Sequence, residues 1–314
     1  MTLQELRYIV ALADSGHFGQ AAEACHVTQS TLSTQLKKLE DYLGITLFDR
    51  SLKRITPTPT GRAIVHSARI VVEEAERIRT LARQSNEDIM DCTLQLGVIP
   101  TVGPYYLPHA LLPMHKAHPQ LKLLLREEQT ERLLVGLREG RFDAALLALP
   151  LEDKTGLEVI PLYQEPFVVA LPATHPLSAR DQLKLSDLNH QTLLLLEEGH
   201  CLRDQALELC GKRSRKTEEV QATSLEMLRQ MVGMNLGITL LPQLAAENAP
   251  RGDKRLIALR HFAPPVPFRT IGLVWRSRSA YAQTLQRLAE TLLKHLPAGV
   301  MASKKPHARK KRSK

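Results

Sequence analysis

Long apolar runs are missing from this 314-residue sequence. A membrane-spanning helix needs roughly 18 consecutive apolar residues, and no uninterrupted run approaches that length. The start of the chain, MTLQELRYIV, also lacks the basic and then apolar layout of a secretory signal. We therefore expect a cytoplasmic protein with no membrane partner.

Cysteine is scarce as well. Four cysteines are too few for a disulfide scaffold, and a reducing cytosol keeps ordinary thiols free, so any disulfide here would serve as a signal. A zinc site is not expected, because His200 and the two cysteines that follow it lack the paired spacing of zinc ligands. The four cysteines are Cys25, Cys92, Cys201 and Cys210, and we expect the first two to be packing residues.

The motifs of common enzymes are absent. The sequence has no glycine-rich phosphate loop, no nucleophile elbow and no supported pair of acid and base residues. We therefore expect a protein that is not an enzyme and that needs no cofactor and no metal. As an enzyme, it could only be a stoichiometric or slow thiol peroxidase.

Acidic residues are missing from the C-terminal tail, residues 301–314, which we expect to be disordered. The tail carries seven basic residues, and removing them from the net charge of +9 leaves +2 for the rest of the chain. Such a tail can contact nucleic acid or an anionic surface, or it can be a frayed and solvated terminus. The composition otherwise matches ordinary soluble proteins, and the length predicts two or three domains of roughly 100 to 200 residues.

Three short helical segments are predicted within residues 1–60. Apolar residues from Leu3 to Ala13 recur at helical spacing, and a second helix is expected over residues 18–24. After a three-residue turn, the third helix is expected over residues 28–40, with Thr28 as its N-cap. The apolar face of this third helix consists of Leu32, Leu36 and Leu39.

The outer face of the third helix suits a nucleic-acid groove. Its short polar side chains can hydrogen-bond base edges and phosphates, and its lysines can neutralise phosphates. Residues 47–50 and 53–61 follow as two short strands around a basic turn, which predicts a winged helix-turn-helix; a small helical domain with a polar surface is the alternative. The residues predicted to contact DNA are Thr28, Gln29, Ser30, Thr31, Ser33, Thr34, Gln35, Lys37, Lys38, Arg50, Lys53 and Arg54.

This segment resembles the amino-terminal signature of LysR-type transcriptional regulators. The resemblance implies a recognition helix in the major groove, a wing on the backbone or minor groove, and promoter DNA as a partner. The sequence motifs that carry the resemblance are Ala21-Ala22, Val27-Thr28-Gln29-Ser30-Thr31-Leu32-Ser33, Leu36-Lys37-Lys38-Leu39-Glu40, Leu43-Gly44, Leu47-Phe48-Asp49-Arg50 and Thr56-Pro57-Thr58-Pro59-Thr60-Gly61.

Residues 61–90 are predicted to form a dimerising linker helix. Apolar residues recur there at gaps of four and three, which is the period that pairs two helices. The alternative is an amphipathic helix packed on its own domain. The resemblance implies pairing, so that two heads engage one two-fold operator. The predicted seam consists of Ile64, Ala68, Val71, Ala75, Ile78 and Ala82.

Strands and helices alternate over residues 91–300, which predicts an α/β domain with a mainly parallel sheet covered on both faces. About 200 residues of this kind suit two lobes with a ligand between them. The resemblance likewise implies a bilobal, periplasmic-binding-protein-like effector domain. Strands are expected over residues 94–99, 121–126, 143–149, 167–171, 192–196, 238–241 and 270–276, and helices over residues 106–116 and 131–139.

Cys201 and Cys210 present a geometric conflict. If residues 201–210 are helical, nine steps of ~1.5 Å place the two Cα atoms ~13.5 Å apart, whereas a disulfide needs less than ~7 Å. The helix must therefore unwind before the sulfurs can bond. The helix start should favour a thiolate at Cys201, which would react first and be resolved by Cys210, although nearby carboxylates such as Asp204 oppose it. Two buried structural cysteines are the alternative.

Several further sequence motifs resemble those of the peroxide-sensing branch of the LysR-type regulators. They lie at residues 98–105, 199–206, 222–226, 237–242 and 269–274. This resemblance implies that Cys201 meets hydrogen peroxide and that Cys210 closes the disulfide. It also implies that Thr101, Thr130, His200 and Arg269 form the peroxide pocket, with Arg269 as the cation that the thiolate needs. The basic segment 211–219 departs from the pattern of that branch.

The predicted function is therefore a redox-sensing activator of antioxidant genes, assembled as a dimer of dimers. It implies hydrogen peroxide as the signal, RNA polymerase as a partner, and a thiol reductant such as glutaredoxin or glutathione to reset the disulfide. One alternative is a LysR-type regulator that answers a small organic effector between its lobes. The other is a thiol peroxidase.

Overall fold

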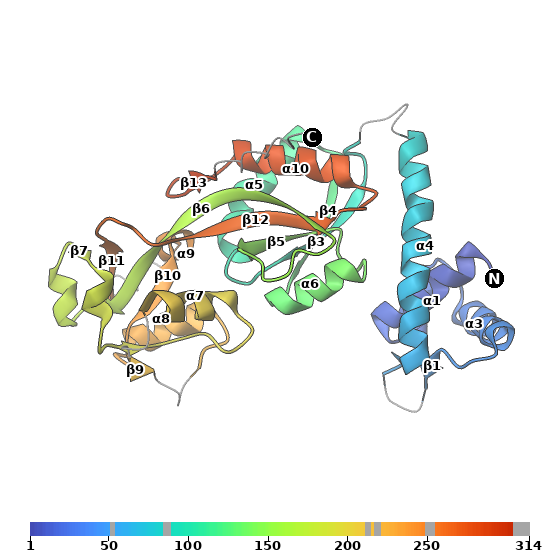
Figure 1. The fold of residues 1–314 in the computed structure, drawn as a ribbon, viewed down its shortest axis with the longest axis horizontal. Helices are drawn as coiled ribbons and strands as arrows, with labels where there is room; N and C mark the ends of the chain where they lie inside the picture. The colour runs from blue at the N-terminus through green and yellow to red at the C-terminus, as the bar shows by residue number, and fades with distance from the viewer. Residues whose placement is uncertain (51–53, 84–88, 211–214, 217–220, 249–254, 304–314) are drawn as a thin grey trace, which may run out of the picture.

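The computed structural model describes residues 1–50, 54–83, 89–210, 215–216, 221–248 and 255–303. Figure 1 shows a helical head that contains the N-terminus, and a larger α/β part in which helices flank a long sheet. The long helix α4 (Pro59–Arg83) runs along the head on the side of the larger part.

The head is a winged helix-turn-helix, as predicted. Its helices are α1 (Leu3–Ser15), α2 (Phe18–Ala24) and α3 (Gln29–Leu43). The wing is formed by β1 (Phe48–Asp49), which pairs antiparallel with β2 (Thr56–Pro57). The buried core between these elements includes Ile9, Leu12, Leu32, Leu36, Leu39, Leu47 and Phe48.

Local sequence sets the ends of these helices. Thr2 and Glu5 form a capping box at the start of α1, and the side chain of Thr28 caps α3 as predicted. Both helices end at a glycine in the left-handed region, Gly16 and Gly44, each with a φ of 69°. Local caps therefore satisfy terminal backbone groups of α1 and α3 without contacts from distant parts of the chain.

α4 begins at Pro59, directly after the wing. Proline is favourable at the first position of a helix because its missing N–H would have no partner there. Gly61 then lets α4 pass close to the wing, since a Cβ atom at this position would lie 2.0 Å from the Leu47 carbonyl oxygen. The head and the linker helix are thus joined without an intervening loop.

The predicted seam of α4 is divided between two environments. Ala68 is 3% exposed within the core of the head in the same chain, so the prediction that it faces a partner is wrong. Ile64 is partly buried against the same core, and its place in the seam stays a prediction. Small and branched side chains there allow α4 to lie against α1. Val71 and Ile78 are 49% and 63% exposed, and the side chain of Ala82 lies outside the described residues.

The larger part consists of two lobes. Lobe I contains β3 (Thr93–Val98), α5 (Gly103–Ala117), β4 (Lys122–Glu127), α6 (Thr130–Arg138), β5 (Ala144–Leu149) and α10 (Ala282–Lys294). Lobe II contains 3-10 turns at Pro176–Ala179 and Leu185–Leu188, then β7 (Gln182–Leu183), β8 (Thr192–Leu193), α7 (Cys201–Cys210), β9 (Arg215–Lys216), α8 (Leu225–Gly233), β10 (Thr239–Pro242), α9 (Gln243–Glu247) and β11 (Ile257–Phe262). Each lobe has its own apolar core, so the bilobal prediction is confirmed.

Two long strands pass from one lobe to the other, β6 (Leu157–Pro172) and β12 (Phe268–Arg276), and they pair antiparallel (Figure 1). The short β13 (Met301–Ala302) also pairs antiparallel with β6. β3 is parallel to β4 and β5, but the pairs that β6 makes with β10, β11 and β12 are antiparallel. The expectation of a mainly parallel sheet is therefore wrong, because the chain returns between the lobes along β12.

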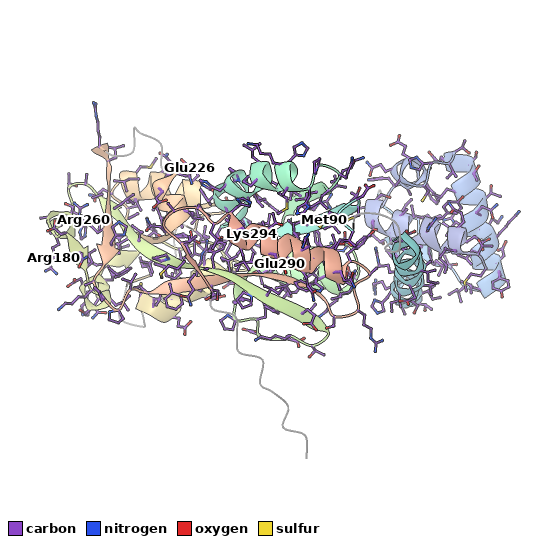
Figure 2. The ribbon with its side chains drawn as sticks, turned by 90° about the horizontal axis from the view of Figure 1, so that it is seen from above. Met90, Arg180, Glu226, Arg260, Glu290 and Lys294 are labelled. Atoms are coloured by element: carbon purple, nitrogen blue, oxygen red, sulfur yellow. The ribbon has the colours of Figure 1, made fainter. Side chains whose placement is uncertain are left out.

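Figure 2, seen at right angles to Figure 1, shows Arg180 and Arg260 at the far end of lobe II, and Glu290 and Lys294 on α10 of lobe I. Arg180 pairs with Asp187 at 2.8 Å, and Arg260 donates to the Ser178 carbonyl. In the part of the chain that the structure describes, no helix is both long and apolar enough to cross a membrane.

Candidate functional site

The two cysteines of interest mark the two ends of α7, which spans Cys201–Cys210 as predicted. Neither cysteine is joined in a disulfide. Because helical geometry holds their Cα atoms ~13.5 Å apart, no disulfide can form between them while α7 is intact.

A narrow cleft with about 160 Å³ of empty space borders Cys201. Three loops or helix starts build it: the segment after β3, the start of α6, and the start of α7. The first two belong to lobe I and the third to lobe II, so the cleft lies where the lobes meet. Its lining consists of Ile99, Pro100, Thr101, Gln129, Thr130, Gly199, His200 and Cys201.

Arg269 reaches this cleft through Thr101. Its Nη1 donates to the Thr101 hydroxyl at 2.8 Å and its Nη2 to the Thr101 carbonyl at 2.9 Å. The side chains of Arg269 and Glu165 are each 1% exposed and form an ion pair of 2.7 Å. The structure therefore brings all four residues predicted for the pocket around Cys201, either in the lining or one hydrogen bond behind it. Glu165 was not predicted.

Burial dominates the chemistry of the Cys201 thiol and raises its pKa. The charge of Arg269, a hydrogen bond from Thr130 and the backbone N–H of Leu202 each lower that pKa, and Asp204 raises it. The expectation that the helix start makes Cys201 a ready thiolate is therefore wrong for this form, because desolvation outweighs the three favourable contacts. Arg269 does act as the expected compensating cation.

Three polar groups near Cys201, from His200, Thr130 and Gln205, have hydrogen-bonding capacity that the described residues leave unused. Burial lowers the pKa of His200, whose Nε2 lies 3.8 Å from Glu197, so its ring is neutral at neutral pH. Among the described residues, the buried Thr130 hydroxyl and the buried Gln205 Oε1 have no nitrogen or oxygen partner. Gln205 lies one turn after Cys201 on α7, and this i, i+4 spacing, which places both side chains on one face of the helix, is the sequence signal that marks it.

Cys210 differs sharply from Cys201. It is 5% exposed within the core of lobe II, and burial raises its pKa to about 11. Its thiol is therefore protonated at neutral pH and is a poor nucleophile in this form. Cys25 and Cys92 pack against the cores of the head and of lobe I, as predicted for packing residues.

The polar face of α3 is open to solvent. Thr28, Gln29, Ser30, Thr31, Thr34, Lys37 and Lys38 are exposed, whereas Ser33 and Gln35 are partly buried. The Thr28 hydroxyl accepts the Thr31 N–H, so part of its hydrogen-bonding capacity is used for capping.

In the wing, the guanidinium of Arg50 pairs with Glu40 at 2.8 Å and stacks over Phe18. Arg54 is exposed, and Lys53 lies outside the described residues.

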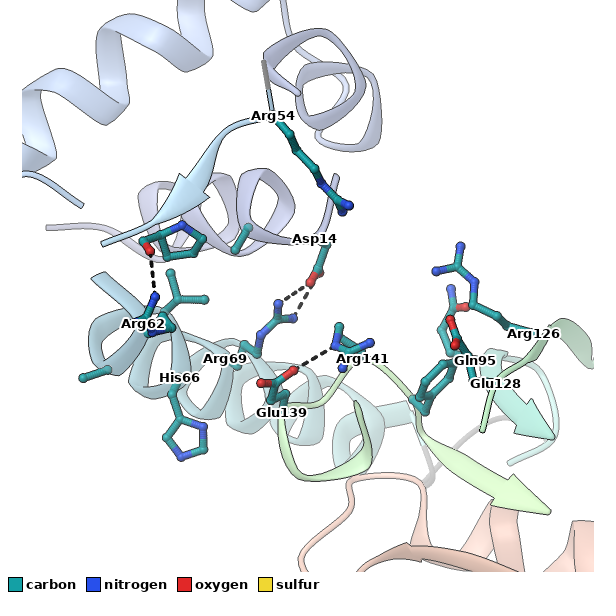
Figure 3. A pocket seen from close by; sticks show the side chains of 15 residues that line it. Asp14, Arg54, Arg62, His66, Arg69, Gln95, Arg126, Glu128, Glu139 and Arg141 are labelled. Carbon is teal, nitrogen blue, oxygen red and sulfur yellow. Dashed lines mark hydrogen bonds and ion pairs between the residues drawn. The ribbon is translucent and has the colours of Figure 1, made fainter. Parts of the chain in front are cut away.

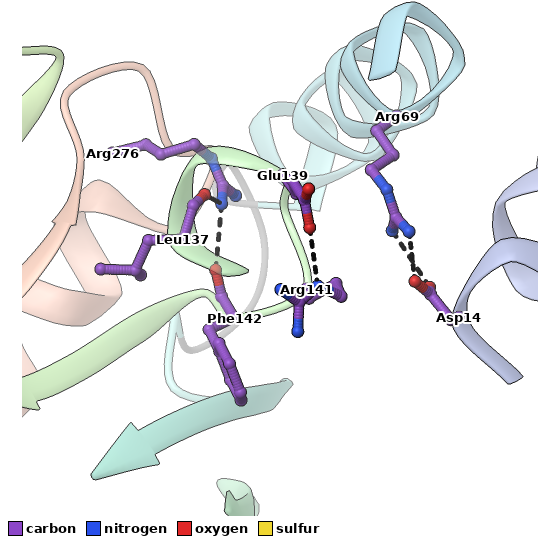
Figure 4. A network of polar contacts seen from close by, with 7 residues as sticks. All are labelled: Asp14, Arg69, Leu137, Glu139, Arg141, Phe142 and Arg276. Carbon is purple, nitrogen blue, oxygen red and sulfur yellow. Dashed lines mark hydrogen bonds and ion pairs between the residues drawn. The ribbon is translucent and has the colours of Figure 1, made fainter. Parts of the chain in front are cut away.

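A second, charged cleft of about 910 Å³ lies between the head with α4 and lobe I (Figure 3). Arg69 pairs with Asp14 on the side of the head, and Arg141 pairs with Glu139 at 2.8 Å on the side of lobe I. Figure 4 shows these two pairs beside Arg276, which donates to backbone carbonyls of lobe I. The first pair thus joins α4 to α1 of the head, and the second lies within lobe I. The remaining charged lining residues are Arg54, Arg62, Arg126 and Glu128.

Metal binding has no support in the described ranges, where no group of three or more His, Cys, Asp and Glu side chains could hold an ion. The chemistry available at the Cys201 cleft is therefore that of a thiol, two hydroxyls, a neutral imidazole and a buried guanidinium.

Comparison with known proteins identifies both parts of the chain. Residues 3–62 match the bacterial regulatory helix-turn-helix proteins of the lysR family, and residues 91–297 match the LysR substrate binding domain. The DNA-binding transcriptional dual regulator OxyR of Escherichia coli K12 is 42% identical over 293 residues, which cover 93% of this chain and 95% of that protein. A probable hydrogen peroxide-inducible genes activator of Mycobacterium avium is 44% identical over 290 residues, covering 92% of each chain.

Solved structures agree with these relatives. A full-length OxyR variant from Pseudomonas aeruginosa superposes with a TM-score of 0.81 at 42% identity, covering 93% of this chain and 94% of that one. The oxidized form of an OxyR matches 66% of this chain and 97% of that one, with a TM-score of 0.61 and 40% identity. On these similarities, the chain belongs to the LysR family of transcriptional regulators, in its OxyR branch.

Proposed function

We propose that this chain is a DNA-binding regulator that senses hydrogen peroxide by forming a reversible Cys201–Cys210 disulfide and that it activates antioxidant genes. The observation that carries the proposal is the placement of two reduced cysteines at opposite ends of α7, with Cys201 on the cleft and Cys210 in the core. Relatives with 39–44% identity are named hydrogen peroxide-inducible genes activators, which supports the same function.

The chemistry takes two steps. The Cys201 thiolate attacks one peroxide oxygen, so that an S–O bond forms and the O–O bond breaks; the departing hydroxide takes a proton and leaves as water. The Cys210 thiolate then attacks the sulfenic sulfur, the S–S bond forms, and a second water leaves. Overall, two thiols lose two electrons and peroxide is reduced to two molecules of water.

The cleft residues have complementary roles in the first step. Arg269 and Thr130 offset the burial of the sulfur and so raise the share of thiolate. The hydroxyls of Thr101 and Thr130 and the neutral ring of His200 can hold peroxide and donate a proton to the leaving oxygen. In this form the cleft has no room for a water-sized molecule, so it must open slightly to admit peroxide. An organic effector would need a far larger opening, since pockets for such ligands span roughly 300 to 1,000 Å³.

The second step supplies the signal. Because Cys210 must leave the core of lobe II and α7 must unwind, oxidation changes the packing of that lobe. In a dimer of dimers, this change would alter how paired heads lie on promoter DNA and how the complex contacts RNA polymerase. A cellular thiol reductant such as glutaredoxin or glutathione would reverse the disulfide and reset the regulator.

The test is to treat purified, reduced protein with substoichiometric peroxide and to map disulfides by mass spectrometry. We expect a Cys201–Cys210 bond in the wild type. Cys201→Ser should abolish the peroxide response while leaving DNA binding by the reduced protein intact. A Cys210 that stays free after Cys201 is oxidised would defeat the proposal. Multiple turnovers with a dithiol, unaffected by removing residues 1–60, would instead indicate a thiol peroxidase.

A further inference from the structure

Glu165 is a buried carboxylate on β6, between Tyr163, which belongs to the core of lobe I, and Phe167, which belongs to the core of lobe II. Its side chain is 1% exposed, yet both of its oxygens have partners. Oε2 accepts from Nε of Arg269 at 2.8 Å and from Nη2 at 2.7 Å, and Oε1 accepts the Leu244 N–H at 2.9 Å. A carboxylate with this many donors is fixed in one orientation.

Arg269 is held between Glu165 and the cleft. Glu165 and Arg269 are directly opposite each other in the pairing of β6 with β12. Two of the donors of the guanidinium face Glu165, and two face the hydroxyl and carbonyl of Thr101. Since an arginine carries five N–H donors in a rigid plane, fixing one edge on Glu165 determines where the other edge lies.

The two charges act unequally on the sulfur. Among the described residues, Arg269 and Asp204 are the charged groups that shift the pKa of the Cys201 thiol, and Glu165 is not one of them. Glu165 is not part of the cleft lining, and Arg269 connects it to Thr101, which is. Without Glu165, a guanidinium at 1% exposure would lose the one anionic partner that it has among the described residues, which strongly disfavours its present position.

We propose that Glu165 is a positioning residue for the reaction of Cys201 with peroxide. It holds Arg269 on Thr101 at the cleft, and it joins this arrangement to the first turn of α9 through the Leu244 N–H. Glu165 touches neither the sulfur nor the cleft and acts through Arg269. The reaction in question rests on the proposed function, but the effect on Cys201 can be measured with an electrophile other than peroxide.

The test uses the full-length, reduced protein with Glu165→Gln, which keeps the shape and removes the charge. We expect the second-order rate constant for oxidation of Cys201 by hydrogen peroxide to fall about tenfold or more, since small displacements of a positioned group have such effects. Alkylation of Cys201 by iodoacetamide, followed on its peptide by mass spectrometry, should shift to higher pH, because the charge of Arg269 no longer favours the thiolate. Arg269→Ala should have the same effects, and the double variant should add little to either single one.

Two further variants complete the experiment. Glu165→Asp keeps the charge at shorter reach and should recover part of both the rate and the pH profile. Asp153→Asn breaks an exposed ion pair with Arg138 on lobe I and should change neither. Thermal melts identify the folded variants; if Glu165→Gln does not fold, Glu165→Asp decides.

The proposal is overturned if folded Glu165→Gln keeps the wild-type rate and alkylation profile, or if the Glu165→Gln and Arg269→Ala effects add. Where Glu165→Gln does not fold, a Glu165→Asp variant with the wild-type rate and profile overturns it. A wild type that forms no disulfide with peroxide defeats the proposed function instead. In that case the alkylation profile still decides the role of Glu165.

Discussion

At the scale of single residues, the surroundings of the two thiols of α7 divide the reaction between them. Cys201 has a cation, a hydroxyl and a backbone N–H that oppose the effect of burial, whereas burial raises the pKa of Cys210 to about 11. Peroxide therefore meets a thiol that can ionise in place. Cys210 becomes a nucleophile only after it leaves the core, so the order of the two steps is fixed by burial.

The raised pKa of Cys210 predicts how stability depends on pH. Its pKa is about 11 in the folded protein against 9.0 for the free thiol, so the stability that the neutral thiol contributes is complete below pH 9 and is lost as the pH rises through 11. Measured by urea unfolding under reductant, the free-energy difference between wild type and Cys210→Ala should shrink by up to about 3 kcal/mol over this range. Leu202→Ala, a cavity variant in the same core, should keep a constant difference from wild type; a constant difference for Cys210→Ala as well would refute the assignment.

Sequence similarity located Thr101, Thr130, His200 and Arg269, and the structure places them together at Cys201. Glu165 could not be predicted from the sequence, because its partner Arg269 is 104 residues away and a buried ion pair between two strands leaves no local sequence pattern. The state of the Cys201 thiol was also mispredicted. Helix position can be read from sequence, but the desolvation that outweighs it depends on how two lobes close over the sulfur.

Among the secondary-structure elements, α7 controls the switch, because its helical backbone keeps Cys201 and Cys210 too far apart to bond. The helix has to break for the disulfide to form, so its intrinsic stability sets the barrier to the second step and leaves the first unaffected. The structure fulfils the condition on which the sequence argument rested, since α7 spans Cys201–Cys210. Strand direction in the sheet was mispredicted, because it depends on the long return of β12 along β6.

The dependence on helix stability can be tested at Glu208, which is exposed near the end of α7. Glu208→Ala and Glu208→Gly differ by about 1 kcal/mol in helix propensity and bury nothing. We expect disulfide closure to be about fivefold faster with glycine than with alanine, and formation of the sulfenic acid to proceed at equal rates. Quenched-flow trapping of the sulfenic acid with dimedone, with mass spectrometry of the disulfide, separates the two steps.

The matched control is the same pair of substitutions at Glu290, an exposed position of α10 that the switch does not use. It should change neither rate. Equal closure rates for the two Glu208 variants would mean that α7 does not unwind before the sulfurs meet.

For the whole protein, the proposed function requires a change in lobe II to reach DNA, and we propose that the arrangement of paired chains carries it. The polar face of α3 is already exposed in this form, so oxidation need not uncover it. What can change is the spacing of paired heads. The linker helix offers a surface for pairing beyond the head: Ile70, Val71 and Ile78 are 55%, 49% and 63% exposed. Heptad spacing predicted that this part of α4 pairs with a partner. It could not show that Ala68 is buried in the head of its own chain, because alanine suits a contact with a partner helix and a contact with the head equally well.

The last prediction concerns this exposed face of α4. Val71→Asp and Ile78→Asp each place a charge where an apolar contact between two chains would form, and neither side chain is part of the core of the head. We expect both variants to sediment as a smaller species than the wild type. On DNA with two half-sites, affinity should fall about a hundredfold or more, because the second head no longer binds at the high effective concentration that linkage provides. Affinity for a single half-site should be unchanged, which shows that each head remains folded. His66→Asp adds the same charge at an exposed position on a different face of α4 and should leave the sedimentation unchanged. If Ile78→Asp keeps both the wild-type mass and the affinity for two half-sites, α4 does not pair the subunits, and the signal from lobe II must reach the heads by another contact.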